Sequence, residues 1–402
     1  MNLRRLFLQT IVDTALAAGL VLALGVVFAI DHQKPPAETP GGEVKLQTVE
    51  QAQDVPPAGP VRRLRLGVTP LPGEGYDDMG KLLDSLGQGY KYTSFPLDDL
   101  RKGEKLSDFD VIFFTCSGVP QSWLGKRIGD SQRKGAGVFE PNVEVLKQVS
   151  DNLRNFVLAG GTLYASDLHY KLIAQAFPEV AQPQQAQEGK TQKLNAEVVD
   201  AGLRELIGGE MPLEFDQAGW YPAAFEGKDV TVYLRGKYTT DAGTSQTAPL
   251  MVKFPEHDGT VIFTSFHNEK QNSETEIKLL RYLVFSAVTA EVETKVQRTM
   301  VQGGFSPAKK NLFSASAAEQ SATSVYHADK PGHLQFVLGF QNAGAQLRLT
   351  VVAPDGSKRE QQSASTITID VPNAQAGDWS YTVTAVKLPS ENFPFTVTVG
   401  QK

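Results

Sequence analysis

The hydrophobic pattern of this chain changes its period once, near residue 303, and that change limits the folds it can adopt. Between residues 61 and 290, apolar runs of strand length alternate with segments whose apolar residues recur every three or four positions, as in helices. Beyond residue 303, apolar and polar residues alternate one by one between short turns, which is typical of half-buried strands. We therefore expect an α/β domain at 61–290, a connector at 291–310 and an all-β domain at 311–402.

The pattern at 61–290 predicts a mostly parallel sheet with flanking helices, because strands and helices alternate along the chain. We expect strands at 63–68, 91–95, 110–115, 162–165, 229–234, 249–254 and 259–266, and helices at 79–86, 143–158, 167–177 and 274–288. The last two strands are joined by the turn sequence EHDG, which predicts an antiparallel pair. In open sheets of this class, functional residues gather at the carboxyl ends of strands.

The pattern at 311–402 predicts a small antiparallel β-sandwich of the immunoglobulin-like type. We expect strands at 333–339, 347–353, 366–371, 379–385 and 393–399. The sequences PDGS and QAGD separate strands as turns. Because many cell-surface domains use such sandwiches, we expect this domain to contact another protein of the cell envelope.

An apolar segment at residues 6–30 predicts a single-pass transmembrane signal anchor within 1–30, with the lipid bilayer as its partner. As a helix, the segment would be about 37 Å long, enough to cross a hydrocarbon core of about 30 Å. Arg4 and Arg5 precede it, so the N-terminus is expected inside a bacterial inner membrane and the body in the periplasm or outside. A cleaved signal peptide is the alternative interpretation. Residues 31–60 contain six prolines and no aromatic residue, which predicts a Pro-rich linker.

The charge and cysteine content argue against several functions. The formal net charge is −6 and the body has no block of Lys or Arg, which argues against a nucleic-acid partner. The single cysteine, Cys116, excludes an internal disulfide and a Cys-rich metal cluster. The turn at 73–75 lacks the glycine spacing of a nucleotide-binding loop and carries Glu74. We therefore expect no bound cofactor.

The sequence GTVIFTSFHNE at 259–269 places a histidine and an acid just beyond a predicted strand and ahead of an amphipathic helix. This arrangement resembles the class I glutamine amidotransferase-like fold, including its ThuA-like branch. The resemblance extends back through DFDVIFFT and LRNFVLAGGTLYASDLHY, and it implies a flavodoxin-like sheet. It also implies that His267 is a general base oriented by Glu269. The nucleophile elbow of the family then falls at Ser166 or Asp167.

The chain departs from that family at the elbow. The strained turn needs small residues two positions on either side of the nucleophile. Around Ser166 and Asp167, these positions include the larger residues Tyr164, Leu168 and His169. No cysteine is present in this segment. We therefore expect no glutaminase activity, while a serine or aspartate nucleophile stays open.

The acid and histidine candidates also have other interpretations. Asp167 would cap the helix expected at 167–177, and His267 would be a hydrogen-bonded residue at a strand end. These two residues could converge with His169 and Glu269 as metal ligands. Because sequence spacing does not show convergence, no metal site is expected.

Three further residues are candidate ligand contacts. Cys116 follows the strand expected at 110–115, where a thiol is either reactive or simply buried. Trp220 lies in DQAGWYPAAF and would line a pocket or cover an edge of the sheet. His169 would belong to the same site or lie on the surface.

Two functions follow from these observations. The first is a membrane-anchored, extracytoplasmic binding or scaffold protein with a catalytically degenerate amidotransferase-like domain. The alternative is a cell-envelope hydrolase with Ser166 or Asp167 as nucleophile. In the hydrolase, His267 would be the base and Glu269 the orienting acid. That alternative requires the nucleophile to lie within hydrogen-bond reach of His267 in an open cleft.

Overall fold

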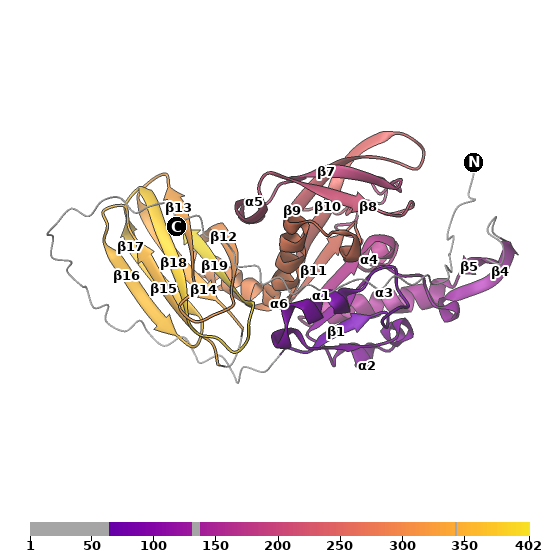
Figure 1. Ribbon diagram of the computed structural model, residues 1–402, viewed down its shortest axis with the longest axis horizontal. Coiled ribbons are helices and arrows are strands. Elements are labelled where there is room, and N and C mark those ends of the chain that lie inside the picture. The colour runs from indigo at the N-terminus through magenta and orange to yellow at the C-terminus, as the bar shows by residue number, and fades with distance from the viewer. Residues whose placement is uncertain (1–63, 131–136, 342–343) are drawn as a thin grey trace.

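The computed structural model describes residues 64–130, 137–341 and 344–402. The predicted anchor at 1–30 and the predicted linker at 31–60 lie outside the described residues. Within the part of the chain that is described, no helix has the length and hydropathy needed to cross a bilayer. Figure 1 shows an α/β body and a β-sandwich, with helix α6 (Glu274–Gln302) between them.

The α/β body is built around a nine-stranded sheet whose two halves differ in strand direction. The parallel half contains, in spatial order, β2 (Tyr92–Ser94), β1 (Leu66–Thr69), β3 (Val111–Phe114), β6 (Thr162–Ser166) and β11 (Gly259–Thr264). The antiparallel half continues with β10 (Ser245–Glu256), β9 (Thr231–Thr239), β7 (Gln192–Val198) and β8 (Glu210–Phe215). The expected mostly parallel sheet is therefore corrected to a mixed one.

Short connections explain part of the antiparallel half. A two-residue turn joins β10 to β11 and a five-residue turn joins β9 to β10, whereas a parallel pair would need a longer crossover. The strands expected from the sequence do not include β7 and β8, although the buried residues of β8 alternate with exposed or half-buried ones as in a half-buried strand. β7 reads QKLNAEV and has few apolar residues to reveal a strand.

Two layers of helices cover the sheet. On one face pack α1 (Met79–Leu86), α5 (Ala201–Ile207) and α6, and on the other α2 (Gly103–Leu106), α3 (Val143–Leu158) and α4 (Tyr170–Ala176). Within β3, Val111 and Phe113 join the first core and Ile112 and Phe114 the second, because side chains alternate along a strand. The strands β4 (Leu124–Asp130) and β5 (Gly137–Pro141) form a separate hairpin. The helices expected at 79–86 and 143–158 are confirmed with these bounds.

Helix α6 is longer than the sequence pattern predicts. It begins at a capping box formed by Ser273 and Glu276, and it ends at Gln302 instead of residue 288. The segment at 291–310 is therefore mainly the second half of this helix and the start of the next strand. The first half of α6 packs in the α/β core, and the second half packs against the sandwich.

The sandwich consists of two antiparallel sheets around one core. One sheet has the order β12 (Ser306–Ala315), β19 (Phe393–Gln401), β14 (Gly332–Gly339) and β17 (Ile367–Ala374). The other has the order β13 (Ser321–Ala328), β18 (Gly377–Lys387), β15 (Gln346–Val352) and β16 (Lys358–Ser363). The five strands expected from the sequence are present, while β12, β13 and β16 are additional.

A buried ionic group joins the two domains. Glu293 on α6 accepts from Nζ of Lys253 on β10 through Oε2 at 2.9 Å, and from Nζ of Lys310 on β12 through Oε1 at 2.7 Å. We call these three residues the junction triad. Tyr90 adds a second link, since its hydroxyl donates to the backbone oxygen of Asn392 at 2.5 Å. The sandwich is thus docked on the α/β domain.

Candidate functional site

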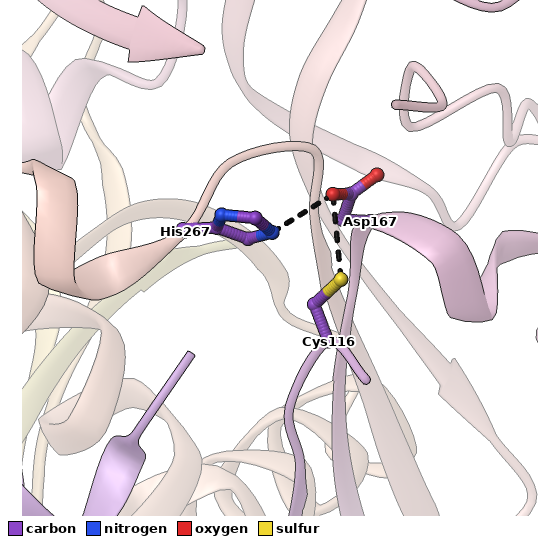
Figure 2. A group of neighbouring side chains, drawn as sticks. All are labelled: Cys116, Asp167 and His267. Carbon is purple, nitrogen blue, oxygen red and sulfur yellow. Dashed lines mark hydrogen bonds and ion pairs between the residues drawn. The ribbon is translucent and has the colours of Figure 1, made fainter. Parts of the chain in front are cut away.

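Three parallel strands end side by side and bring three candidate residues together. β6 lies between β3 and β11 and pairs in parallel with both. Cys116, Asp167 and His267 follow these strands at one edge of the sheet. Figure 2 shows their side chains facing one another. We call these three residues the edge cluster.

Asp167 contacts both other members of the edge cluster. Its Oδ2 lies 3.0 Å from Nε2 of His267 and accepts a hydrogen bond from Sγ of Cys116 at 3.4 Å. One potential ligand atom of each residue lies within 4.8 Å of the others. The exposed fractions of Cys116, Asp167 and His267 are 0 %, 4 % and 3 %. The edge cluster is therefore enclosed by protein.

Asp167 occupies the elbow at the end of β6. Its φ is +49°, in the left-handed region that residues other than glycine seldom adopt. Its Oδ1 accepts a hydrogen bond from the backbone N–H of Tyr221 at 3.3 Å. The carboxylate thus faces the edge cluster and Tyr221, and no side-chain capping bond forms at the start of the following turn. Strained backbone of this kind concentrates at functional sites.

His267 is held between two carboxylates. Its Nδ1 lies 2.9 Å from Oδ1 of Asp216, and because a carboxylate only accepts, Nδ1 carries the proton of this bond. Lys270 also approaches Asp216, with Nζ 3.6 Å from Oδ2. Asp216 is missing from the sequence predictions because the strand before it, β8, is missing too. Its position directly after a strand end is the feature that would have identified it.

The edge cluster shifts the pKa values of its members. Burial lowers the pKa of His267, but the contacts with Asp167, Asp216 and Cys116 outweigh burial, and the pKa is raised overall. Burial and the nearby charge of Asp167 raise the pKa of the Cys116 thiol to about 12. Asp167 contributes to both shifts, because its carboxylate lies against the imidazole of His267 and the thiol of Cys116.

Glu269, the expected orienting acid, faces a different residue. Its side chain forms an ion pair with Lys81 on α1. Glu269 lies in the short 3₁₀ turn Asn268–Lys270, and its backbone N–H donates to Oδ1 of Asp77 at 3.1 Å. This turn directs Glu269 toward α1, and Asp216 stands beside His267 in the place expected for Glu269.

Ser166 and His169 support the loop that carries Cys116. Oγ of Ser166 accepts a hydrogen bond from the backbone N–H of Cys116 at 2.9 Å. His169 stacks on Phe114 with ring centroids 3.6 Å apart, and its Nε2 donates to the backbone oxygen of Thr115 at 2.8 Å. Burial lowers the pKa of His169 to about 3, so this ring is neutral near pH 7. His169 is therefore a core residue and lies neither on the surface nor in the edge cluster.

Trp220 lies in the segment between β8 and β9. Its ring stacks on Phe215 with centroids 3.9 Å apart, and its Nε1 donates to the backbone oxygen of Lys190 at 2.8 Å. The side chain is buried and belongs to a hydrophobic core. Only its neighbour, Tyr221, reaches the edge cluster, through the backbone donor to Asp167.

The edge cluster contains the groups for two kinds of chemistry. A carboxylate at an elbow beside an imidazole is the arrangement of a nucleophile with a base. A thiol, a carboxylate and an imidazole nitrogen are also the donor set of a transition-metal site. The first requires access for a substrate, and the second only for an ion.

Comparisons with known proteins do not give a family. No protein-family model matches the chain, and no curated protein matches it. Among solved structures, a cytoplasmic protein from Salmonella typhimurium is 15 % identical, with 55 % of this chain and 98 % of that chain covered and a TM-score of 0.31. A glutamine amidotransferase from Thermotoga maritima is 12 % identical, with coverages of 60 % and 90 % and a TM-score of 0.31.

A β-galactosidase from Bacillus circulans is also similar over part of its length. It is 9 % identical, 73 % of this chain and 35 % of that chain are covered, and the TM-score is 0.27. At scores this low, these likenesses establish neither a family nor an activity.

Proposed function

We propose that this chain is a membrane-anchored, extracytoplasmic binding or scaffold protein whose α/β domain keeps an amidotransferase-like fold without the reaction. Numbered along the chain, the strands of the parallel half have the order 2-1-3-4-5, which is the flavodoxin-like order. The apolar segment at 6–30 supports the membrane anchor, and the basic residues before it support an extracytoplasmic body.

The environment of Asp167 is the observation that carries this proposal. A carboxylate stands at the elbow, where the amidotransferases have a thiol. Tyr221 occupies one of its oxygens, while Cys116 and His267 lie against the other. A nucleophile needs a path to its substrate, and this side chain is 4 % exposed. These facts favour a domain that keeps the fold of an enzyme but not its catalytic activity.

The hydrolase alternative has one observation in its favour. Oδ2 of Asp167 lies 3.0 Å from Nε2 of His267, which is the reach that a nucleophile and base require. The open cleft that the same mechanism requires is not found at these enclosed side chains. Ser166 is a weaker candidate, because it is fully buried and its hydroxyl is bonded to the backbone of Cys116.

The sandwich is the part that we assign to partner binding. The junction triad and the Tyr90–Asn392 bond hold it on the α/β domain, so the two domains present one continuous body. β13 is an edge strand, and its Val325 is 45 % exposed. The backbone oxygen of Val325 accepts from Nζ of Lys309 at 2.8 Å, so the exposed Val325 side chain is what this edge strand offers to another protein.

Photo-cross-linking of the full-length chain in native membranes tests this assignment. A photoreactive amino acid at Val325 is compared with the same amino acid at Val143, which is 68 % exposed at the start of α3. We expect an adduct of one defined mass from Val325 and none from Val143, because the partner contacts the sandwich. Equal yields from both positions would contradict the proposal.

Turnover measurements separate the two functions. The purified full-length chain is assayed with amide and ester substrates, and we expect no turnover above the uncatalysed rate. Turnover that disappears in Asp167→Asn but persists in Glu269→Gln would establish the hydrolase instead, since Glu269 faces Lys81 and not His267.

A further inference from the structure

We propose that Cys116, Asp167 and His267 bind one divalent transition-metal ion of the zinc class. This inference does not depend on the proposed function, because a metal site is compatible with a scaffold and with an enzyme. It rests on the spacing of the three ligand atoms, on an imidazole nitrogen that lacks a hydrogen bond, and on the groups that hold each ligand from behind.

The spacing of the ligand atoms fits a tetrahedral site. Zn–S, Zn–N and Zn–O bonds of about 2.3, 2.0 and 2.1 Å place the ligand atoms of such a site roughly 3.3–3.6 Å apart. The distance from Sγ of Cys116 to Oδ2 of Asp167 is 3.4 Å, and from Nε2 of His267 to the same oxygen it is 3.0 Å. All three atoms lie within 4.8 Å of one another, so small shifts would bring them around one ion.

Nε2 of His267 is the atom that points to a ligand. It is buried and makes no hydrogen bond, although Oδ2 of Asp167 is close, so that contact lacks the direction of an N–H···O bond. The residue is 3 % exposed, so water in the bulk does not solvate this nitrogen. In Figure 2 the nitrogen faces the carboxylate of Asp167 and the sulfur of Cys116. A cation between these three groups would satisfy it.

Each ligand is held from behind by a second group. Nδ1 of His267 donates to Asp216 at 2.9 Å, which directs Nε2 toward the site and matches the carboxylate–histidine–metal arrangement. Oδ1 of Asp167 accepts from Tyr221, which leaves Oδ2 for the ion. Ser166 accepts from the backbone N–H of Cys116 at 2.9 Å. Such supporting bonds are typical of built metal sites.

The charges balance when the ion is bound. Metal binding requires Cys116 as a thiolate and Nε2 of His267 without a proton, so protons on these two atoms leave to solvent. One thiolate, one carboxylate and one neutral imidazole then surround a dication, so that the ion and its ligands carry no net charge. Without the ion, Sγ of Cys116 donates to Oδ2 of Asp167.

The ligand types select the class of metal. A thiolate disfavours Mg²⁺ and Ca²⁺, which take oxygen ligands, whereas thiolate with imidazole and carboxylate suits Zn²⁺ and Co²⁺. Three protein ligands leave a fourth position for water or a small exogenous ligand. Because the side chains are enclosed, that ligand must be small.

Cobalt titration of the full-length chain in detergent, after treatment with a chelator, tests the site. Cys116 is the only cysteine, so a thiolate-to-cobalt charge-transfer band arises from this residue alone. We expect the band to saturate at one equivalent of Co²⁺ and to disappear when Zn²⁺ is added. No band in the folded wild-type chain would overturn the proposal, and so would saturation without thiolate absorption.

Variants test the thiolate ligand and the residue that orients His267. Cys116→Ala should lose the band, and Asp216→Asn should weaken Co²⁺ binding about 10–100-fold, because Asp216 orients His267 without touching the ion. His327→Gln is the matched control: His327 also pairs with a carboxylate, that of Asp378, but on the exposed surface of the sandwich. Circular dichroism verifies that each variant is folded. Equal weakening in His327→Gln and Asp216→Asn would show surface binding and overturn the proposal.

Discussion

Two enclosed ionic groups in this molecule differ in how completely their polar atoms are hydrogen-bonded. In the junction triad, Glu293 uses one oxygen for Lys253 and the other for Lys310, and Lys253 also lies 3.2 Å from Oγ of Ser286. In the edge cluster, Nε2 of His267 makes no hydrogen bond, and Oδ2 of Asp167 is shared between two neighbours. Both carboxylate oxygens of the first group are paired within the protein, whereas an imidazole nitrogen of the second is left for a further ligand.

This difference separates a structural role from a functional one. A buried ion pair does not necessarily add stability, but removal of one partner leaves an uncompensated charge and is costly. The junction triad should therefore respond to loss of a charge, and the edge cluster should respond to a cation. Charge removal, added Zn²⁺ and acid each test this contrast.

Glu293→Gln should cause the largest loss of stability. It leaves Lys253 buried without its carboxylate, and we expect the free energy of unfolding to fall by about 3 kcal/mol, near the lower limit for such pairs because Lys310 is 20 % exposed. Urea unfolding measures the change. Glu274→Gln is the control, since Glu274 is 74 % exposed in its pair with Lys278 and should cost less than about 1 kcal/mol. Similar losses in both variants would show that the junction triad contributes no more to stability than an exposed ion pair.

Zn²⁺ should stabilise the wild-type chain and Glu293→Gln equally. At free Zn²⁺ of 100 times Kd, a ligand that binds only the folded state adds about 2.7 kcal/mol. Because the edge cluster and the junction triad share no residue, this gain should be additive with the loss in Glu293→Gln. Thermal unfolding with and without Zn²⁺ measures it. Cys116→Ala should lose most of the gain, and an unchanged gain in that variant would place the ion elsewhere.

Acid should remove the contribution of the junction triad. Burial raises the pKa of Glu293, but Lys253 and Lys310 outweigh burial and lower it from 4.5 to about 2. A depressed folded-state pKa gives stability that is fully present above pH 4.5 and is lost as the pH falls toward 2. We expect the stability difference between wild type and Glu293→Gln to shrink by roughly 2.5 kcal/mol across this window. A difference that is constant with pH would mean that Glu293 does not titrate in this range.

Glu269→Gln should have the smallest effect. Its partner Lys81 is 70 % exposed, so loss of this pair should cost less than about 1 kcal/mol. Metal affinity should not change, because Glu269 does not support His267. Chemical unfolding and cobalt titration check both points. A tenfold loss of affinity would return the orienting role to Glu269 and would weaken the assignment of Asp216.

The sequence predicts the parallel half of the fold better than the antiparallel half. Strongly apolar strands such as 110–115 and amphipathic helices such as 143–158 carry a clear period, and both are found near the expected bounds. β7 has few apolar residues to mark it, and the apolar alternation of β8 spans only six residues. The second half of α6 was also missed, because it leaves the α/β core and packs against the sandwich instead.

In the candidate site, too, the sequence predicts some of the residues and not others. Cys116, Asp167 and His267 each follow an apolar strand, and parallel strands end at one edge, so the sequence could suggest their meeting. The partner of His267 depends on turn direction: a 3₁₀ turn directs Glu269 toward Lys81, while Asp216 arrives from β8, far away in sequence. Residue spacing within the segment at 259–269 therefore indicates neither the direction of this turn nor the position of Asp216.

Helix α6 sets how this protein can be divided. Its first half is buried with the sheet of the α/β body, while Val296 and Met300 in its second half pack with Phe305 and Val337. The apolar pattern of the first domain stops at residue 290. A cut there would divide a continuous helix and leave a newly exposed end on each half. Neither domain is therefore a detachable module, and fragments intended to fold alone should keep α6 whole through Gln302.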